Sequence, residues 1–85
     1  MATLFERVRD VVVAQLKVSP DEVTPEASLV DDLRADSLDI VDLTIAIEEA
    51  FANDAQDLEI SDEVAENIRV VQDIIDFLRE HGVAE

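Results

Sequence analysis

The sequence predicts an all-α fold: a small four-helix bundle with three longer helices, one short helix and a long first loop. Its 85 residues include one glycine and two prolines, so few positions favour a break in a helix. Apolar side chains recur at intervals of three and four residues, which is the spacing of one helix face. The length is that of one small domain, and we expect residues 1–85 to fold as a single unit.

The first helix is predicted over residues 3–16. Thr3 and Glu6 have the spacing of a capping box, in which each side chain accepts a hydrogen bond from the other residue's backbone amide. The apolar residues of this segment fall on one stripe of the helix: Leu4, Phe5, Val8, Val11, Val12 and Leu16.

Residues 17–35 contain both prolines and are expected to form a long ordered loop. The segment from Ser19 to Glu22 is typical of a short capped turn with proline at the first helical position, and Thr24-Pro25-Glu26 repeats this pattern. A connection of this length in a compact domain is often functional. Apolar side chains at intervals would hold the loop on the core: Val18, Val23, Ala27, Leu29 and Leu33.

The second helix begins at Asp36, which has N-cap spacing relative to Asp39, an acidic variant of the capping box. We expect this helix to end near Phe51 or Ala52. Its core stripe is formed by Ile40, Leu43, Ile47, Ala50 and Phe51.

Residues 53–59 are polar and acidic, which indicates a surface loop. Ser61 then caps a short third helix that extends to about Asn67. Val71, Ile74, Ile75 and Leu78 predict a final helix over residues 70–81, with His81 in its last turn and Gly82 as the residue that terminates it.

The second helix carries a further apolar row, formed by Leu38, Val41 and Ile45 on the side away from its core stripe. One interpretation is that this row packs beneath the loop of residues 17–35. The other is a docking surface with an apolar centre and an anionic rim, which fits partners that present a hydrophobic spot ringed by arginine and lysine. The carboxylates around the row are Asp39, Asp42, Glu48 and Glu49.

The composition excludes several classes of protein. There are 22 acidic and 6 basic residues, a formal net charge of −16 that repels nucleic acid. No stretch approaches roughly 18 uncharged apolar residues, so we expect no membrane span. Residues 1–10 include Glu6 and Asp10 and lack an apolar run, so we expect no signal peptide.

The chain has no cysteine and one histidine, His81. We therefore expect no disulfide, no metal site, no catalytic residues and no enzymatic activity, and we place the protein in the cytoplasm. This composition favours a carrier, adaptor or scaffold.

Ser37 directly follows the predicted cap of the second helix. It lacks the G-x-S-x-G context of a serine nucleophile, and the one histidine is far along the chain. The start of a helix favours a phosphoester, because its free amides and its dipole stabilise negative charge. Ser37 is therefore predicted to be a modified residue, against the alternative of an ordinary serine in a first helical turn.

The residues from Leu33 to Leu43 resemble the prosthetic-group site of acyl carrier proteins, whose core pattern is Asp-Ser-Leu followed by an acidic, apolar-rich helix. The resemblance extends to the loop at Ser19-Pro20 and Pro25–Leu29, to Glu48–Phe51 and to Glu59–Glu66. It covers nearly the whole chain.

This resemblance implies that Ser37 carries 4′-phosphopantetheine, installed from coenzyme A by a phosphopantetheinyl transferase with magnesium. The thiol of the arm would hold acyl intermediates as thioesters for fatty-acid or related lipid and polyketide synthesis, with the acyl chain sheltered between helices. We expect a monomer that meets synthesis and transfer enzymes through their basic patches. The partner-binding residues would be Asp36, Leu38, Asp39, Val41, Asp42, Ile45, Glu48, Glu49, Asp62 and Glu66.

The sequence departs from the family pattern at two places. Arg34 stands where the family often has glycine, which argues against a positive φ there. Its charge would either reduce the affinity for some basic partners or pair with Asp31 or Asp32. Residues 53–57 look like an insertion relative to common fatty-acid carriers. The alternative function is an unmodified acidic helical adaptor that binds basic protein partners.

Overall fold

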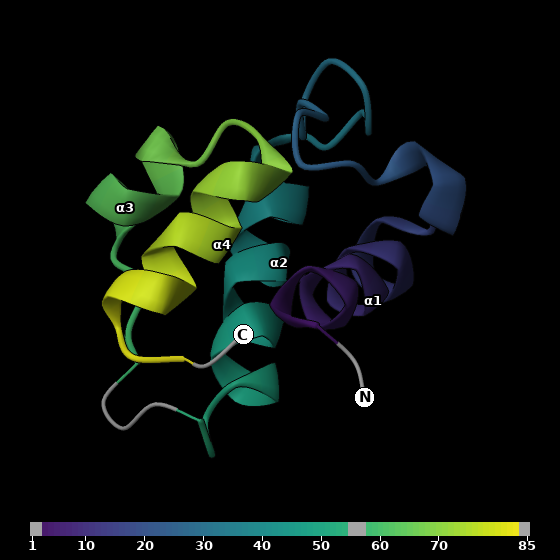
Figure 1. The fold of residues 1–85 in the computed structure, drawn as a ribbon. Coiled ribbons are helices and arrows are strands. Elements are labelled where there is room, and N and C mark those ends of the chain that lie inside the picture. Colours follow the sequence, from purple (N-terminus) through teal and green to yellow (C-terminus); the bar gives the residue numbers. More distant parts are fainter. Residues whose placement is uncertain (1–2, 55–57, 84–85) are drawn as a thin grey trace.

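The computed structural model describes residues 3–54 and 58–83. They form four α-helices and a short 3₁₀ helix: α1 (Leu4–Leu16), η1 (Pro20–Glu22), α2 (Ser37–Ala50), α3 (Asp62–Asn67) and α4 (Val71–Glu80). No strand is present among these residues, so the predicted all-α fold, with one short helix and a long first loop, is confirmed. Figure 1 shows α2 between α1 on one side and α3 on the other, with α4 in front.

The start of α1 is fixed by the predicted capping box. The Glu6 amide donates to Thr3 Oγ1 at 3.2 Å, and the Thr3 amide donates to Glu6 Oε1 at 3.4 Å. The helix ends at Lys17, whose left-handed φ of 56° turns the chain into the loop.

The loop between α1 and α2 is held on the core, as predicted. Val23, Ala27, Leu29 and Leu33 are buried, and Val18 is half-buried. Backbone hydrogen bonds also join the loop to the start of α4: the Leu29 amide donates to the Arg69 carbonyl at 2.9 Å, and the Val71 amide donates to the Ala27 carbonyl at 3.1 Å. The loop is therefore an ordered part of the fold, and its last residues lead into α2.

The two capped turns predicted in the loop take different forms. Pro20 occupies the first position of η1, as expected, although the Ser19 side chain makes no cap hydrogen bond. The repeat of the pattern at Thr24-Pro25-Glu26 gives a turn without a helix, in which the Ala27 amide donates to the Thr24 carbonyl at 3.0 Å.

The core face of α2 differs from its prediction at two positions. Leu43, Ile47 and Phe51 are buried and Ile40 is half-buried, but Ala50 is exposed, so its assignment to the core was wrong. Thr44 is buried in addition, and its hydroxyl donates to the Val41 carbonyl at 2.7 Å. That bond satisfies the polar group within the helix, so a threonine is tolerated where the apolar pattern does not show a core position.

The last two helices follow the prediction closely. Ser61 caps α3, its Oγ accepting from the Val64 amide at 3.3 Å. The final helix ends in a Schellman motif, in which Gly82 has a φ of +88° and the Val83 amide donates to the Leu78 carbonyl at 3.0 Å. His81 is the C-cap of this helix and lies one residue past its last turn.

The predicted surface loop at residues 53–59 is described in part. A turn continues α2 to Asp54, whose carboxylate forms an ion pair with Arg7 of α1, and Leu58 packs against the core. The apparent insertion at residues 53–57 lies largely outside the described residues, because residues 55–57 are not described.

Candidate functional site

Ser37 is the first residue of α2 and is exposed. The helix begins there because Asp36 and Asp39 form the predicted acidic capping box: the Asp39 amide donates to Asp36 Oδ1 at 2.9 Å, and the Asp36 amide donates to Asp39 Oδ2 at 3.1 Å. The first intrahelical hydrogen bond of α2 runs from the Ile40 amide to the Asp36 carbonyl, so the amides of Ser37 and Leu38 have no acceptor within the helix. The site thus presents a hydroxyl beside backbone donors and the positive end of a helix dipole.

A tight turn before α2 sets the position of Ser37. Its hydrogen bonds centre on Ser28, whose amide donates to Asp32 Oδ2 at 2.7 Å and whose Oγ accepts from the Asp31 amide at 3.1 Å. The Leu33 amide donates to the Ser28 carbonyl at 3.0 Å, and the Ala35 amide donates to the Leu29 carbonyl at 2.8 Å. These bonds fix the path of the chain up to Ala35, which is buried, and so place Asp36 at the start of the helix.

Arg34 corrects two of the expectations from the sequence. Its φ is 59°, so a positive φ is needed here although the residue is not glycine. The chain leaves the turn of residues 28–33 through this left-handed residue, which costs an arginine about 1–2 kcal/mol relative to glycine. Pairing with Asp31 or Asp32 was also wrong, since in residues 3–54 and 58–83 the ion pairs are Arg7–Asp54 and Arg79–Asp76.

Ser37 opens onto a cavity of about 590 Å³ between the loop, α2, α3 and the connection from α3 to α4. Apolar and acidic side chains form most of its wall, with one arginine among them. The lining residues are Ser28, Val30, Asp31, Ser37, Ile40, Val41, Asp62, Ala65, Glu66, Ile68 and Arg69. A group attached to the Ser37 hydroxyl therefore has a partly apolar space beside it.

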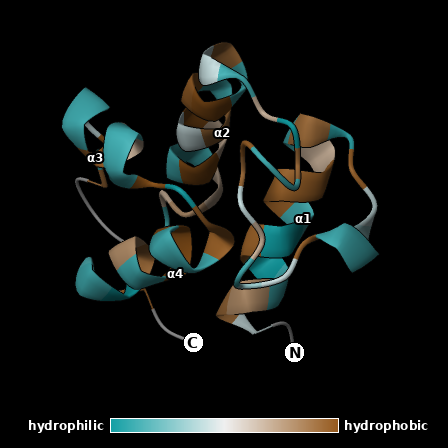
Figure 2. Ribbon diagram, turned by 90° about the horizontal axis from the view of Figure 1, so that it is seen from above, coloured by the Kyte–Doolittle hydropathy of each residue, from teal (hydrophilic) through white to brown (hydrophobic). Residues whose placement is uncertain are grey.

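The additional apolar row of α2 is exposed: 72% for Leu38, 45% for Val41 and 49% for Ile45. These exposures contradict the interpretation that the row packs beneath the loop, because those three side chains retain about half of their surface or more in solvent. Figure 2 shows hydrophobic colour along α2 and mostly hydrophilic colour on α3. The helix therefore supplies one apolar face to the core and a second to solvent.

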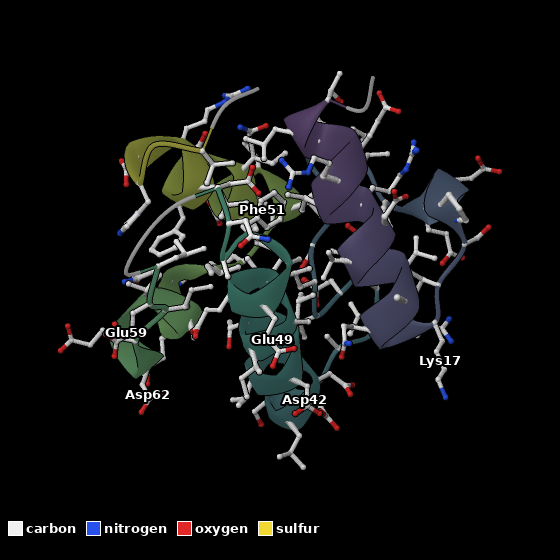
Figure 3. All side chains as sticks on the ribbon, turned by 90° about the horizontal axis from the view of Figure 1, so that it is seen from below. Lys17, Asp42, Glu49, Phe51, Glu59 and Asp62 are labelled. Atoms are coloured by element: carbon white, nitrogen blue, oxygen red, sulfur yellow. The ribbon has the colours of Figure 1, made fainter. Side chains whose placement is uncertain are left out.

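The carboxylates predicted around this row lie on both sides of it. Glu49 lines a shallow groove with α1, and Asp42 is exposed. Glu48 lies on the side of α3 and is half-buried, because its Oε1 accepts from the Ile60 amide at 3.0 Å. Figure 3 shows Asp42 and Glu49 at the periphery of α2, Asp62 on α3, and Phe51 directed inward among the helices.

The other predicted partner-binding residues have two kinds of environment. Asp36 and Asp39 belong to the capping box, so their carboxylates fix the start of α2 in addition to facing solvent. Asp62 and Glu66 of α3 are exposed and line the cavity in front of Ser37. The structure therefore brings the α3 pair to the same site as Ser37.

Sequence reasoning missed two residues of this site. Val30 is 55% exposed and lines the cavity with Val41, although it lies in the loop. Arg69 lines the cavity from the connection between α3 and α4. Only the contact between the loop and the start of α4 brings Arg69 there, and no local pattern of the sequence shows that contact.

Within residues 3–54 and 58–83, no group of three or more histidine, aspartate and glutamate side chains is arranged to hold a metal ion. In these ranges no helix has both the length and the apolar character needed to cross a bilayer.

The comparisons with known proteins cover nearly the whole chain and concern its family. The family model described as "Phosphopantetheine attachment site" matches residues 6–78. The "Acyl carrier protein" of Bdellovibrio bacteriovorus is 53% identical over 81 residues, covering 95% of this chain and 97% of the relative. The "Acyl carrier protein" of Syntrophobacter fumaroxidans is 48% identical over 84 residues, covering 99% and 98%. From these matches over nearly its whole length, the chain belongs to the acyl carrier protein family, whose cofactor is 4′-phosphopantetheine.

Proposed function

We propose that this protein carries acyl intermediates as thioesters on a 4′-phosphopantetheine arm esterified to Ser37, and delivers them to enzymes of fatty-acid or related lipid and polyketide synthesis. The observation that carries the assignment to Ser37 is its position: an exposed hydroxyl on the first residue of α2, at the edge of a cavity of about 590 Å³.

The start of α2 suits the phosphodiester of such an arm. The amides of Ser37 and Leu38 and the helix dipole favour an anion at this point. The cap residue Asp36 satisfies the Asp39 amide with its own side chain, so the two preceding amides are left for the modified serine. When bound, the arm supplies a thiol, which this cysteine-free chain lacks.

The cavity suits an acyl chain that must be sheltered but released. Val30, Ile40, Val41 and Ile68 offer apolar wall beside Ser37. Burial is worth about 0.8 kcal/mol per methylene, so several methylenes favour sequestration while leaving it reversible on docking. The wall also contains Asp62, Glu66 and Arg69, so part of the cavity is polar.

The face around Ser37 suits basic partners, first of all a phosphopantetheinyl transferase and then synthesis and transfer enzymes. Its exposed centre of Leu38, Val41 and Ile45 offers apolar area, and carboxylates lie on both sides. Complementary charge raises the association rate and orients the encounter. The proposed contact residues are Asp36, Leu38, Asp39, Val41, Asp42, Ile45, Glu48, Glu49, Asp62 and Glu66.

We further propose that residues 1–85 act as one domain, in the cytoplasm, as a monomeric carrier without catalytic activity of its own. The absence of cysteine and the high acidity of the sequence support the compartment and the role as a freely diffusing carrier. The core runs from α1 through the loop to α4, which supports a single domain.

The test is the mass of the protein after incubation with coenzyme A, magnesium and a phosphopantetheinyl transferase. Wild type should gain the mass of one arm, and Ser37→Ala should gain nothing. Ser19→Ala is the matched control, because Ser19 is also exposed and precedes a helix, and its side chain makes no cap hydrogen bond. A wild type that stays unmodified with several transferases would support an unmodified acidic adaptor instead.

A further inference from the structure

Arg69 is the one basic residue among those that line the cavity beside Ser37. It lies in the connection between α3 and α4, whereas Ser37 begins α2. In a protein with a net charge of −16, a guanidinium beside the attachment serine is the exception to its surroundings.

The backbone of Arg69 is held from both sides. Its amide donates to Asp73 Oδ2 at 2.9 Å, and its carbonyl accepts from the Leu29 amide at 2.9 Å. The neighbouring Val70 pairs with Ser28, which also lines the cavity. These bonds fix the position of the Arg69 backbone, while the residue itself is exposed.

The carboxylates in the cavity wall do not capture the guanidinium. Asp31, Asp62 and Glu66 line the same space, yet the ion pairs found in residues 3–54 and 58–83 are Arg7–Asp54 and Arg79–Asp76. An arginine that forms no such pair keeps its planar set of donors for another anion, and this set matches a phosphate or a carboxylate in two-point geometry.

We infer that Arg69 is a positioning residue that binds an anionic group carried by the arm on Ser37. This inference rests on the proposed attachment at Ser37. The anion is either the phosphodiester that joins the arm to the serine or a carboxylate at the end of a dicarboxylic acyl chain. In both cases Arg69 holds the arm along the cavity, over its apolar wall.

The experiment follows the side-chain Nε–H signals of the arginines by NMR in the apo and holo proteins, together with the ³¹P signal of the holo protein. If the phosphodiester is the ligand, the Arg69 signal shifts from apo to holo, while those of Arg7 on α1 and Arg79 at the end of α4 stay in place. Arg69→Gln then changes the ³¹P shift, and Lys17→Gln, which removes the same charge on the far side of the bundle, does not (Figure 3).

Butyryl and succinyl thioesters on the arm test whether the anion is the acyl carboxylate. The two acyl chains have the same number of carbons, and only succinyl carries a terminal carboxylate. If the acyl carboxylate is the ligand, the Arg69 signal moves with succinyl and stays with butyryl. The inference is overturned if the Arg69 signal moves in none of these forms. Glutamine retains the two backbone hydrogen bonds of position 69, so loss of fold does not confuse the result. Failure of the attachment itself is recognised separately, because the mass of the protein then does not increase.

Discussion

Arg7 of α1 and Asp54 after α2 form a two-point ion pair, with Nη2 to Oδ2 at 2.6 Å and Nη1 to Oδ1 at 3.3 Å. The Arg7 guanidinium carbon also lies 4.5 Å from the centre of the buried Phe51 ring. The contact ties the N-terminal helix to the end of the helix that begins with Ser37. The hydrogen bond from Arg7 lowers the pKa of Asp54 below its ordinary value of 3.8, and the same bond raises the pKa of Arg7.

The lowered pKa of Asp54 predicts a pH-dependent contribution to stability. Because the folded pKa lies below the unfolded one, the contribution is present above the unfolded pKa and is lost as the pH falls through the folded pKa. Asp54→Asn should therefore melt below wild type at about pH 6, and the gap should close as the pH falls below 3.8, the ordinary pKa of the carboxyl, and through its lower folded pKa. Thermal melts of both proteins across this range provide the measurement, and a constant gap would contradict the ionic origin.

Arg7 stacks on Phe51 in addition to pairing with Asp54. Arg7→Gln removes both contacts, so it should lower the free energy of unfolding by at least the roughly 0.5–1 kcal/mol of a cation–π contact at an exposed site. Arg7→Lys keeps the charge but loses the two-point hydrogen bonding of the guanidinium, so its free energy of unfolding should lie between those of wild type and Arg7→Gln. Urea unfolding at neutral pH measures the three free energies. Equal stability for all three would show that the two contacts contribute nothing.

The left-handed backbone at Arg34 predicts that glycine stabilises the protein. Relief of about 1–2 kcal/mol of strain exceeds the roughly 0.5–1 kcal/mol that glycine costs through the entropy of the unfolded chain. Arg34→Gly should therefore raise the melting temperature by a few degrees. Arg34→Ala is the control, because it removes the charge and keeps the side chain that a φ of 59° disfavours. An equal gain in both variants would assign the effect to charge.

Much of this fold could be predicted because its local signals agree. Each helix-end signal depends only on residues a few positions away in the sequence. These signals are the capping boxes at Thr3 and Asp36, the serine cap at Ser61 and the terminating glycine Gly82. The second apolar row of α2 followed from the helical period alone, but the period left open whether the loop covers the row, and the exposure of Leu38, Val41 and Ile45 decides this.

The remaining features depend on contacts that no local pattern shows. Arg34 takes a left-handed φ where the chain leaves the hydrogen-bonded turn around Ser28, and an arginine in the sequence does not predict that conformation. Glu48 is drawn to the Ile60 amide by the approach of the segment before α3. Arg69 reaches the site because the loop pairs with the start of α4.

The environments of Glu48 and Glu49 predict different roles for two adjacent carboxylates. Glu48→Ala should lower the free energy of unfolding by about 1 kcal/mol, because it leaves the partly buried Ile60 amide without its acceptor. Glu49→Ala is the matched control and should change it little, since Glu49 is exposed. Urea unfolding compares them, and equal losses in the two variants would contradict the structural role of Glu48.

The high negative charge predicts that cations stabilise the fold. Most of the 22 acidic side chains have no cationic partner, because the whole chain contains 6 lysines and arginines. At low ionic strength the carboxylates repel one another and destabilise the compact state, and millimolar magnesium should raise the melting temperature. Sodium chloride at matched ionic strength is the control and should act more weakly. An unchanged melting temperature with magnesium would contradict the role of repulsion.

The exposed rim of α2 predicts how charge reversal changes modification by a phosphopantetheinyl transferase. Asp42 and Glu49 are the positions to test, because Asp39 also holds the cap and Glu48 also holds the Ile60 amide. Glu49→Lys should lower kcat/KM by up to about tenfold at low salt, chiefly through slower association, and the loss should shrink as salt is added. Glu22→Lys makes the same charge change on the exposed η1, away from this face, and should have a smaller effect. Equal losses in the two variants would assign the effect to net charge, and rates that match wild type at low salt would remove Glu49 from the docking surface.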